Sequence, residues 1–591
     1  MRKKAIVLTS LLLSLIIMLG ACSSGEIQET TQATDPAVTE ENEETEAVAE
    51  ETLPVNPAAD KGNVFTYANV TPPGVFNGVL YTDLYDNYIC SLVFDRLITY
   101  EPETMNFTGK MAESFNPDFD NNTIEFTLRP GIKIHNDLGE MTAEDVAFTI
   151  KMICDPEYDG KHFPLYANII GAGDYKAGNA EIIEGIVLHT EKPENPLPVT
   201  YEPSENNPLK ITLRYNDLSM SNMHVFANYG YILPRAYYEQ HTYAEFKALN
   251  NKPAGTGPYV FNRYLAEEYI EMDKFEDYWQ GSPKIDKVFY QFLTYDNIIP
   301  SLLNGTIDLA EIRNIDHDLN QIDDAAAPHL DMISTQGANF AFIEFRCNDP
   351  VMSDVRVRQA LTFGFDREQF IDTYFSGKAN LAYAVVPRTS SAYPDEDLLI
   401  SYDYDPDKAG ELLDEAGWLM ADDGWRYKDG EKLAVHYTGI ADNANDSMKT
   451  EKMAEEYKLI GVELVPGFHD WEIYMDLVKT DPETQMFGYA WTMNPDPYVS
   501  STLLRSDSIN NDGNYNNPEF DRLCNEARYA KSLEEAARLY QEAYLIINEE
   551  VPMIFMNDYT TISAYNKRVE GLLIDTFLPW TYNIVNMEIK P

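Results

Sequence analysis

Apolar and polar residues alternate along several short segments of the chain, which is the pattern of a strand with one buried face. Every second position is apolar at residues 124–128, 211–215 and 288–292. We therefore predict a β-strand in each of these segments, with one face of the strand packed against a core.

Helical patterns lie between and beyond these segments. Thr142, with Asp145 three residues later, forms a capping box ahead of an apolar helical face. Asp405 precedes a second amphipathic stretch, and Ser532 with Glu535 precedes a third. Strand and helix patterns that mix along the whole chain predict an α/β fold.

Length and charge narrow the class of protein. The chain has 591 residues, of which 44% are hydrophobic. A single core stops growing at about 250–300 residues, so at least two domains are expected. The formal net charge is −53. Such an acidic surface repels phosphate backbones and anionic lipid head groups, which excludes nucleic acid as a partner and electrostatic adhesion to a membrane.

The N-terminal segment is typical of an exported protein. Arg2, Lys3 and Lys4 precede an apolar run over residues 5–19. This run is too short for a transmembrane helix, which needs about 20 apolar residues, and it predicts a signal peptide over residues 1–21. The ending at Cys22 resembles the lipobox of bacterial lipoproteins, which implies a lipid on Cys22 and cleavage before it. The rest of the chain would then lie outside the cytoplasmic membrane, anchored at the cell surface or in the periplasm.

Residues 23–62 have the composition of a tether. They carry 11 acidic side chains and one lysine, with many Thr, Ala and Pro residues. Segments with high net charge and few apolar residues do not bury enough surface to fold. We predict that residues 22–62 form a disordered tether that starts at the lipidated cysteine.

Enzymatic and metal-binding signatures are missing from the sequence. It contains no G-x-S-x-G, H-E-x-x-H or G-x-x-x-x-G-K-[ST] motif. Asp118, Asp120 and Asn122 are spaced like calcium ligands, but Arg129 stands where such a loop needs Glu, so we interpret them as a polar turn. We predict no catalytic residue, no cofactor and no metal.

Four further cysteines, at positions 90, 154, 347 and 524, form no C-x-x-C pair. We expect buried free thiols, and the sequence leaves one long-range disulfide open.

About ten segments, read in order, are similar to those of the oligopeptide/dipeptide-type extracellular solute-binding family of ABC importers, solute-binding family 5. They include LVFDRL at 92–97, MTAEDV at 141–146, GTGPY at 255–259, DVRVRQAL at 354–361 and NPEFD at 517–521. Each segment alone is a weak signal, and their common order over nearly all of 63–591 is a strong one.

Most of these matching residues have structural interpretations. We expect Gly255 and Gly257 to relax a tight turn. Asp354 is placed to cap a helix, and we expect Arg356 and Arg358 to pair with carboxylates rather than to contact a solute.

The resemblance implies a two-lobed, three-domain α/β architecture of the periplasmic-binding-protein type (class II, large peptide-binding type) with a ligand cleft between the lobes. The implied domains are a core domain of the first lobe (63–96, 255–335 and 550–591), a small domain of that lobe (97–254) and the second lobe (336–549). The implied function is that of a monomeric receptor. It would capture a peptide-like solute and deliver it to a permease pair with its ATPases.

The resemblance also points to a ligand loop. In the family this loop reads W-x-x-D-x-x-D-P, and its first Asp holds the α-ammonium of a peptide. Here Trp491, which we expect to stack on the solute, is followed by Asn494 in place of that Asp, in a loop one residue shorter. Asp496 either compensates for the missing carboxylate or is a turn residue before Pro497. An N-blocked, neutral or non-peptide solute, such as an oligosaccharide or a metal chelate, therefore stays open, as does a signalling or adhesion receptor.

Six more residues are predicted either to line the cleft or to lie in the core. They are Asn339, Phe342 and Glu344, which precede the DVRVR segment, Phe555 and Met556 near the return of the chain, and Thr82 in the first segment.

Overall fold

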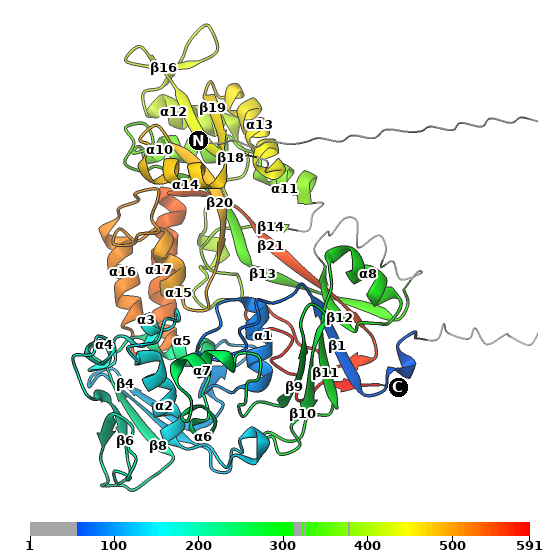
Figure 1. Cartoon of the computed structure of the whole chain (residues 1–591). Coiled ribbons are helices and arrows are strands. Elements are labelled where there is room, and N and C mark those ends of the chain that lie inside the picture. Colours follow the sequence, from blue (N-terminus) through cyan, green and yellow to red (C-terminus); the bar gives the residue numbers. More distant parts are fainter. Residues whose placement is uncertain (1–55, 313–321, 323–326, 376–378, 442, 591) are drawn as a thin grey trace, which may run out of the picture. The chain divides into compact units, whose positions relative to one another are not determined.

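A computed structural model describes residues 56–590 except 313–321, 323–326, 376–378 and 442 (Figure 1). Cys22 and the signal peptide lie outside the described residues. The largest element is an 11-stranded mixed sheet. Its strands, in spatial order, are β19 (Glu463–His469), β18 (Ala434–Ile440), β20 (Met486–Thr492), β13 (Leu330–Phe345), β21 (Met553–Asn566), β12 (Leu309–Ile312), β1 (Val64–Asn69), β11 (Lys287–Phe292), β10 (Tyr269–Lys274) and β9 (Tyr259–Leu265), with β14 (Ala379–Leu381) paired to β21.

Two long strands join the two ends of this sheet. The C-terminal part of β13 pairs antiparallel with β20, and β13 also pairs along much of its length with β21. The distal part of β21 pairs with β12, on the side of β1. The chain therefore passes twice between the two ends of the sheet, through β13 and through β21 (Figure 1).

A second sheet belongs to the segment predicted as the small domain. It has five strands in the order β4 (Ala112–Asp118), β5 (Thr123–Leu128), β8 (Lys210–Arg214), β6 (Ile183–Leu188) and β7 (Val199–Tyr201). The strands predicted at 124–128, 211–215 and 288–292 are confirmed as β5, β8 and β11. Short strand pairs are β2 (Ile98–Tyr100) with β3 (Phe107–Gly109), β22 (Val569–Glu570) with β23 (Glu588–Ile589), and the hairpins of β15 (Leu419–Met420), β16 (Arg426–Lys428) and β17 (Glu431–Lys432).

Helices alternate with these strands along the chain. The described helices that precede the first crossing strand, β13, are α1 (Leu84–Val93), α2 (Ala143–Cys154), α3 (Phe163–Tyr166), α4 (Ala172–Lys176), α5 (Met220–Asn228), α6 (Arg235–Tyr238), α7 (Tyr243–Ala248) and α8 (Tyr295–Leu303). The described helices between the two crossing strands, β13 and β21, are α10 (Val355–Phe363), α11 (Arg367–Phe375), α12 (Pro406–Glu415), α13 (Ala444–Leu459), α14 (Trp471–Thr480), α15 (Pro497–Ser500), α16 (Pro518–Arg528) and α17 (Leu533–Glu550). Among the described helices none is long and apolar enough to cross a membrane.

Helix caps follow the predictions. Thr142 and Asp145 form the capping box of α2. The side chain of Asp405 accepts a hydrogen bond from a backbone N–H of the first turn of α12, and the side chain of Ser532 does the same for α17. These side chains satisfy N–H groups that have no partner within the helix, which is why the helices begin there.

The arginine prediction is half wrong. Arg356 pairs with Asp354 at 2.7 Å as predicted. Arg358, however, is 4% exposed and donates to the backbone carbonyls of Met352, Glu550 and Val551. The last carbonyls of α17 lack partners within the helix and carry its negative dipole end, so they take the place of a carboxylate.

The interpretation of the two glycines is also corrected. Neither Gly255 nor Gly257 has a positive φ. A Cβ would lie 2.1 Å from the carbonyl oxygen of Val93 at position 255, and 2.4 Å from that of Leu92 at position 257. Glycine is needed here because two backbones approach closely at the end of α1, rather than because of a turn conformation.

The folded part starts earlier than residue 63. The side chains of Asn56 and Asn566 hydrogen-bond to one another at 2.7 Å, and Lys61 forms an ion pair with buried Asp308 at 2.8 Å. Asp308 also pairs with Arg568 at 2.8 Å. The last residues of the range predicted as a tether are therefore fixed by contacts to the C-terminal part of the chain.

The cores follow the two ends of the main sheet. One cluster combines residues from Phe65 to Leu309 with the C-terminal residues from Val569 to Met587. Two further clusters lie on the opposite faces of β13 and β21 between the crossings, with Ile343 in one and Phe342 in the other.

The four cysteines that the structure describes, Cys90, Cys154, Cys347 and Cys524, are free thiols. The expected burial holds for Cys90, Cys154 and Cys524, whereas Cys347 is half-buried.

Candidate functional site

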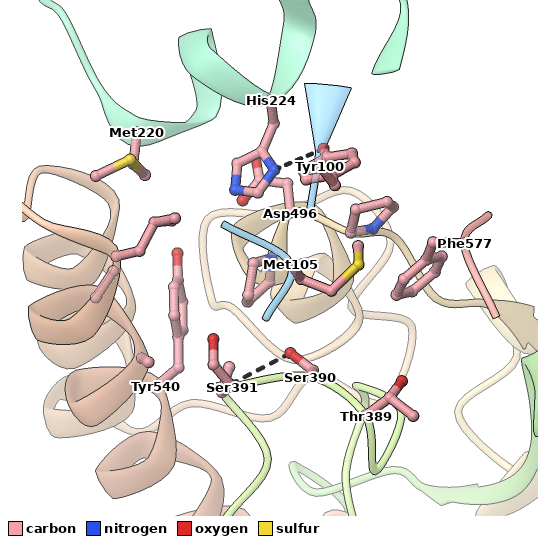
Figure 2. A pocket seen from close by; sticks show the side chains of 16 residues that line it. Tyr100, Met105, Met220, His224, Thr389, Ser390, Ser391, Asp496, Tyr540 and Phe577 are labelled. Carbon is pink, nitrogen blue, oxygen red and sulfur yellow. Dashed lines mark hydrogen bonds between the residues drawn. The ribbon is translucent and has the colours of Figure 1, made fainter. Parts of the chain in front are cut away.

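A pocket lies where all three predicted domains meet (Figure 2). Tyr100 of β2 and His224 of α5 form one wall, and Asp496 at the start of α15 and Tyr540 of α17 form another. Phe577, from the C-terminal segment, closes one end. The remaining lining residues are Met105, Met220, Thr389, Ser390, Ser391, Ala392, Pro495, Pro497, Leu533, Ala536 and Ala537.

Asp496 combines two roles that the sequence left as alternatives. Its Oδ1 accepts a hydrogen bond of 3.0 Å from the backbone N–H of Tyr498, which caps α15 with Pro497 at the first helical position. The residue is 4% exposed and lines the pocket. Within the described residues Oδ2 has no hydrogen bond, so it is available to a solute. Asp496 is thus a helix cap and a lining residue together.

Asn494 connects the two sides of the pocket. Its side-chain amide donates to the hydroxyl of Tyr229 at 3.1 Å, and Tyr229 follows the last turn of α5. Its side-chain carbonyl accepts from the backbone N–H of Asp496 at 3.0 Å. The side-chain oxygen of Asn494 is therefore used inside the loop.

His224 and Tyr100 face Asp496 as neutral groups. A hydrogen bond of 2.9 Å joins the Tyr100 hydroxyl to Nδ1 of His224. Burial lowers the pKa of His224, although the nearby Asp496 carboxylate acts in the opposite direction. Burial raises the pKa of Tyr100 well above its usual range, and Asp496 adds to that shift. Neither group supplies a positive charge to the carboxylate at neutral pH.

The charge of the pocket is therefore unbalanced. The described lining contains neither lysine nor arginine. Its other members are apolar side chains, hydroxyls and the neutral imidazole. Since a buried charge is costly without a partner, this pocket is suited to a solute with a cationic group and an apolar body.

The pocket is narrow. Its volume of about 40 Å³ has room for a few water molecules, whereas sites for small ligands measure about 300–1,000 Å³. A peptide-sized solute can enter only if the walls move apart. The Asn494–Tyr229 hydrogen bond joins those walls.

The other predicted contacts lie elsewhere. Asn339 is exposed and accepts a hydrogen bond of 2.7 Å from Thr492 on the neighbouring strand. Trp491 is half-buried against the core cluster that includes Phe342 and Phe555. Thr82 is exposed just before α1. Of the predicted residues that the structure describes, Asp496 alone lines the pocket between the predicted domains, and Asn494 lies beside it in the same loop.

Two predicted residues, Phe342 and Met556, line a second cavity inside the second lobe. Glu344 is fully buried, accepts a hydrogen bond of 2.8 Å from the backbone N–H of Gly513, and lines neither cavity. Burial raises the pKa of Glu344 well above its usual range. We therefore interpret Glu344 as a neutral carboxyl that packs in the core of the lobe. Its predicted role as a solute contact has no support from the geometry.

Sequence reasoning missed most of the pocket. Tyr100 lies just after the LVFDRL segment, and Tyr540 lies in the helix predicted to begin at Ser532, but neither position carried a signal for ligand contact. Phe577 and the loop 389–392 carried none at all. Among the described residues no cluster suits a metal ion. Asp118 accepts hydrogen bonds from the backbone N–H groups of Asp120 and Asn121, as a polar turn does.

An α/β chain with two sheet-based lobes, two crossing strands and a pocket between them is the architecture of a periplasmic binding protein. The family model for bacterial extracellular solute-binding proteins, family 5 (middle region), matches residues 106–512. The chain belongs to this family.

Curated relatives and solved structures agree with this assignment. The chain is 27% identical over 543 residues to heme-binding protein A of Haemophilus influenzae, covering 88% of this chain and 91% of that protein. It is 23% identical over 580 residues to the oligopeptide-binding protein AppA of Bacillus subtilis, covering 96% of both. The structure of HbpA2 from Haemophilus parasuis superposes with a TM-score of 0.75 at 20% identity, covering 89% of this chain and 100% of that one. The predicted family and fold class are confirmed.

Proposed function

We propose that this chain is the solute receptor of an ABC importer and that it takes a peptide or peptide-like solute with a cationic amine into the pocket between its lobes. The observation that carries the proposal is the Asp496 carboxylate, which lines the pocket and faces no lysine or arginine of the described lining. Asn494 stands where the family has its amine-binding Asp, and Asp496 takes over that role two residues later. The solute's ammonium would supply the missing positive charge.

The test compares peptides that differ only in that charge. Calorimetry would measure the Kd of di- to pentapeptides with a free N-terminus and of their N-acetylated forms. We expect free peptides to bind at least about tenfold more tightly, the worth of one charge-assisted hydrogen bond. Asp496→Asn keeps a residue that caps helices well but removes the charge, so it should abolish the preference.

A matched control is Asp507→Asn, because the Asp507 side chain is 72% exposed and lies outside the pocket lining. It should leave both affinities unchanged. Equal binding of free and acetylated peptides would contradict the proposed amine contact. Binding of heme, an oligosaccharide or a metal chelate in place of peptides would favour the alternative solute classes, of which heme is named by one relative.

Delivery to a permease is the second part of the proposal. The receptor would act as a monomer and hand its solute to membrane subunits driven by cytoplasmic ATPases. Uptake of a bound peptide should stop when the chain is deleted and return with the wild-type chain but not with Asp496→Asn. Uptake that continues without the chain would indicate a signalling or adhesion receptor instead.

We further propose that Cys22 carries a lipid anchor. The basic segment, the short apolar run and the Leu-Gly-Ala-Cys ending support this, and so does membership of an extracellular family. Mass spectrometry of the mature N-terminal peptide should find a diacylglyceryl group on Cys22. Cys22→Ser should release the protein from the membrane fraction. An unmodified Cys22 in the mature protein would contradict the anchor.

A further inference from the structure

The second lobe contains a cavity that the proposed function does not use. Strand β18 pairs with β20 only at Tyr437–Met486 and Thr438–Phe487, and beyond these pairs the two strands separate. A cavity of about 250 Å³ lies in this fork, at the carboxyl ends of both strands. Ligands of open α/β sheets bind at such a position, where strands end and neighbouring connections diverge.

Small residues make the room for this cavity. Ala341 and Ala490 face one another across β13 and β20, and Gly488 lies two positions earlier on β20. A Cβ on Gly488 would come within 2.7 Å of the carbonyl oxygen of Phe342 and 3.2 Å of the Lys449 ammonium. All three small residues line the cavity. Larger side chains at these positions would fill it.

Aromatic side chains form much of the rest of the lining. Phe370, Phe375 and Tyr559 line the cavity, with the ring centroid of Phe375 6.3 Å from that of Phe370 and 6.1 Å from that of Tyr559. Trp471, at the start of α14, also lines the cavity and is 54% exposed. An exposed indole beside a cavity gives it an accessible mouth. Since an apolar cavity of about 150 Å³ already holds benzene, this one, at about 250 Å³, has room for a substituted ring.

One ion pair supplies the polar edge. Lys449 and Asp446 lie 2.7 Å apart, with side chains 12% and 3% exposed. Both oxygens of Asp446 are engaged, because Oδ1 also accepts from the Tyr437 hydroxyl and Oδ2 accepts from the backbone N–H of Ile440. The Lys449 ammonium has three N–H donors, and within the described residues its only carboxylate partner is Asp446. It can therefore donate to a ligand.

The charge balance selects the kind of ligand. Lys449 and Asp446 cancel one another, so a carboxylate placed here would be the second anion beside one cation, which is unfavourable. A neutral acceptor avoids that repulsion and still uses a free N–H group of the ammonium.

We propose that this cavity, the fork between β18 and β20, is a specificity subsite for an aromatic ring of the solute that carries a neutral hydrogen-bond acceptor, as a phenol does. The inference rests on the proposed function in one respect, namely that the ring belongs to a solute captured by the receptor. The cavity selects the ring, whereas Asp496 holds the amine.

The test uses small probes on the full chain. Calorimetry should give phenol a Kd about tenfold lower than that of toluene, as expected for one hydrogen bond to a charged group, and benzoate should bind more weakly than phenol. Ala490→Leu fills the cavity and should abolish binding. Ala537→Leu, a like change in the pocket between the lobes, should not. Lys449→Met keeps the shape and should make phenol and toluene equal.

A soak of crystals with 4-bromophenol keeps the test decisive if a variant fails to fold. The anomalous signal of bromine should lie between Gly488 and Trp471. A bromine elsewhere, no binding of phenol to the wild-type chain, or loss of binding in Ala537→Leu alone would overturn the subsite. Bromophenol in the fork together with no binding of any peptide would retain the subsite and refute the peptide proposal, so the two failures are distinguishable.

Discussion

The side-chain amide of Asn494 donates to the hydroxyl of Tyr229 at 3.1 Å, and this bond joins the loop before α15 to the end of α5. Because the pocket between them is too narrow for a peptide, entry of the proposed solute has to break the bond. A ligand shifts such an equilibrium only by its differential affinity for the two states. The Asn494–Tyr229 contact therefore contributes to the closed state with or without solute.

Tyr229→Phe removes the hydrogen bond and keeps the ring. We expect a peptide affinity about fivefold weaker, equivalent to about 1 kcal/mol, because the closed form loses one contact. Small-angle scattering of the free protein should show a larger radius of gyration. Tyr427→Phe is the matched control, since within the described part of the chain its hydroxyl bonds only to Asp423 on an exposed hairpin. An unchanged affinity and radius in Tyr229→Phe would show that the contact does not hold the lobes together.

The pH dependence of stability should contain a contribution from His135. Its Nε2 lies 2.8 Å from the carbonyl oxygen of Gly257, and its Nδ1 accepts from the backbone N–H of Gly255 at 3.3 Å. This arrangement requires a neutral ring, since a protonated Nδ1 would oppose an N–H donor. Burial lowers the pKa of His135 to about 4, below an ordinary value of about 6.5.

The direction in which stability changes with pH follows from the number of protons that the folded and unfolded states bind. Between about pH 6.5 and 4 the unfolded state binds a proton at this position and the folded state does not, so stability is complete above that window and falls as the pH drops through it. The total loss is about 3 kcal/mol. Urea unfolding at pH 7 and pH 4 should show that His135→Gln, which keeps a donor and an acceptor, loses less stability than the wild type. His436→Gln, at an exposed position, should behave as the wild type. Equal pH profiles for all three proteins would refute this assignment.

Arg358 and Arg356 provide a comparison of a buried and an exposed arginine two residues apart. Arg358→Met should cost about 3–5 kcal/mol, because it leaves the carbonyls at the end of α17 without donors in the core. Arg356→Met should cost less than about 1 kcal/mol, since the Arg356 side chain is 42% exposed in its pair with Asp354. The free energy of unfolding in urea measures both. Similar costs would mean that the carbonyl contacts of Arg358 contribute little.

The same pair of arginines shows what the sequence could and could not predict. Helix caps such as Thr142 and Ser532 were predicted correctly because their partners lie within three residues. The partners of Arg358 include Glu550, 192 residues away, and no local pattern connects the two. The residues of the pocket divide in the same way. Asp496 was predicted because it lies in the loop that resembles the ligand loop of the family. Tyr100 and Phe577 lie far from that loop in the sequence and reach the pocket only because the chain crosses between the lobes twice. Local chemistry is thus predictable, and the opposing walls of a site between lobes are not.

Gly257→Ala tests the close approach of two backbones at the end of α1. A Cβ at this position would lie 2.4 Å from the carbonyl oxygen of Leu92 and 2.6 Å from the carbonyl carbon of Val93. Backbone atoms cannot rotate away as a side chain can, so the segment before β9 and the end of α1 must separate, and we expect a loss of at least about 2 kcal/mol in the free energy of unfolding. Gly173→Ala is the control, because nothing lies within 4 Å of the added Cβ in α4 and alanine favours the helix by about 1 kcal/mol. The control should therefore raise the melting temperature while Gly257→Ala lowers it. If Gly257→Ala melts at the wild-type temperature, then the two backbones accommodate a Cβ and their close approach does not explain this glycine.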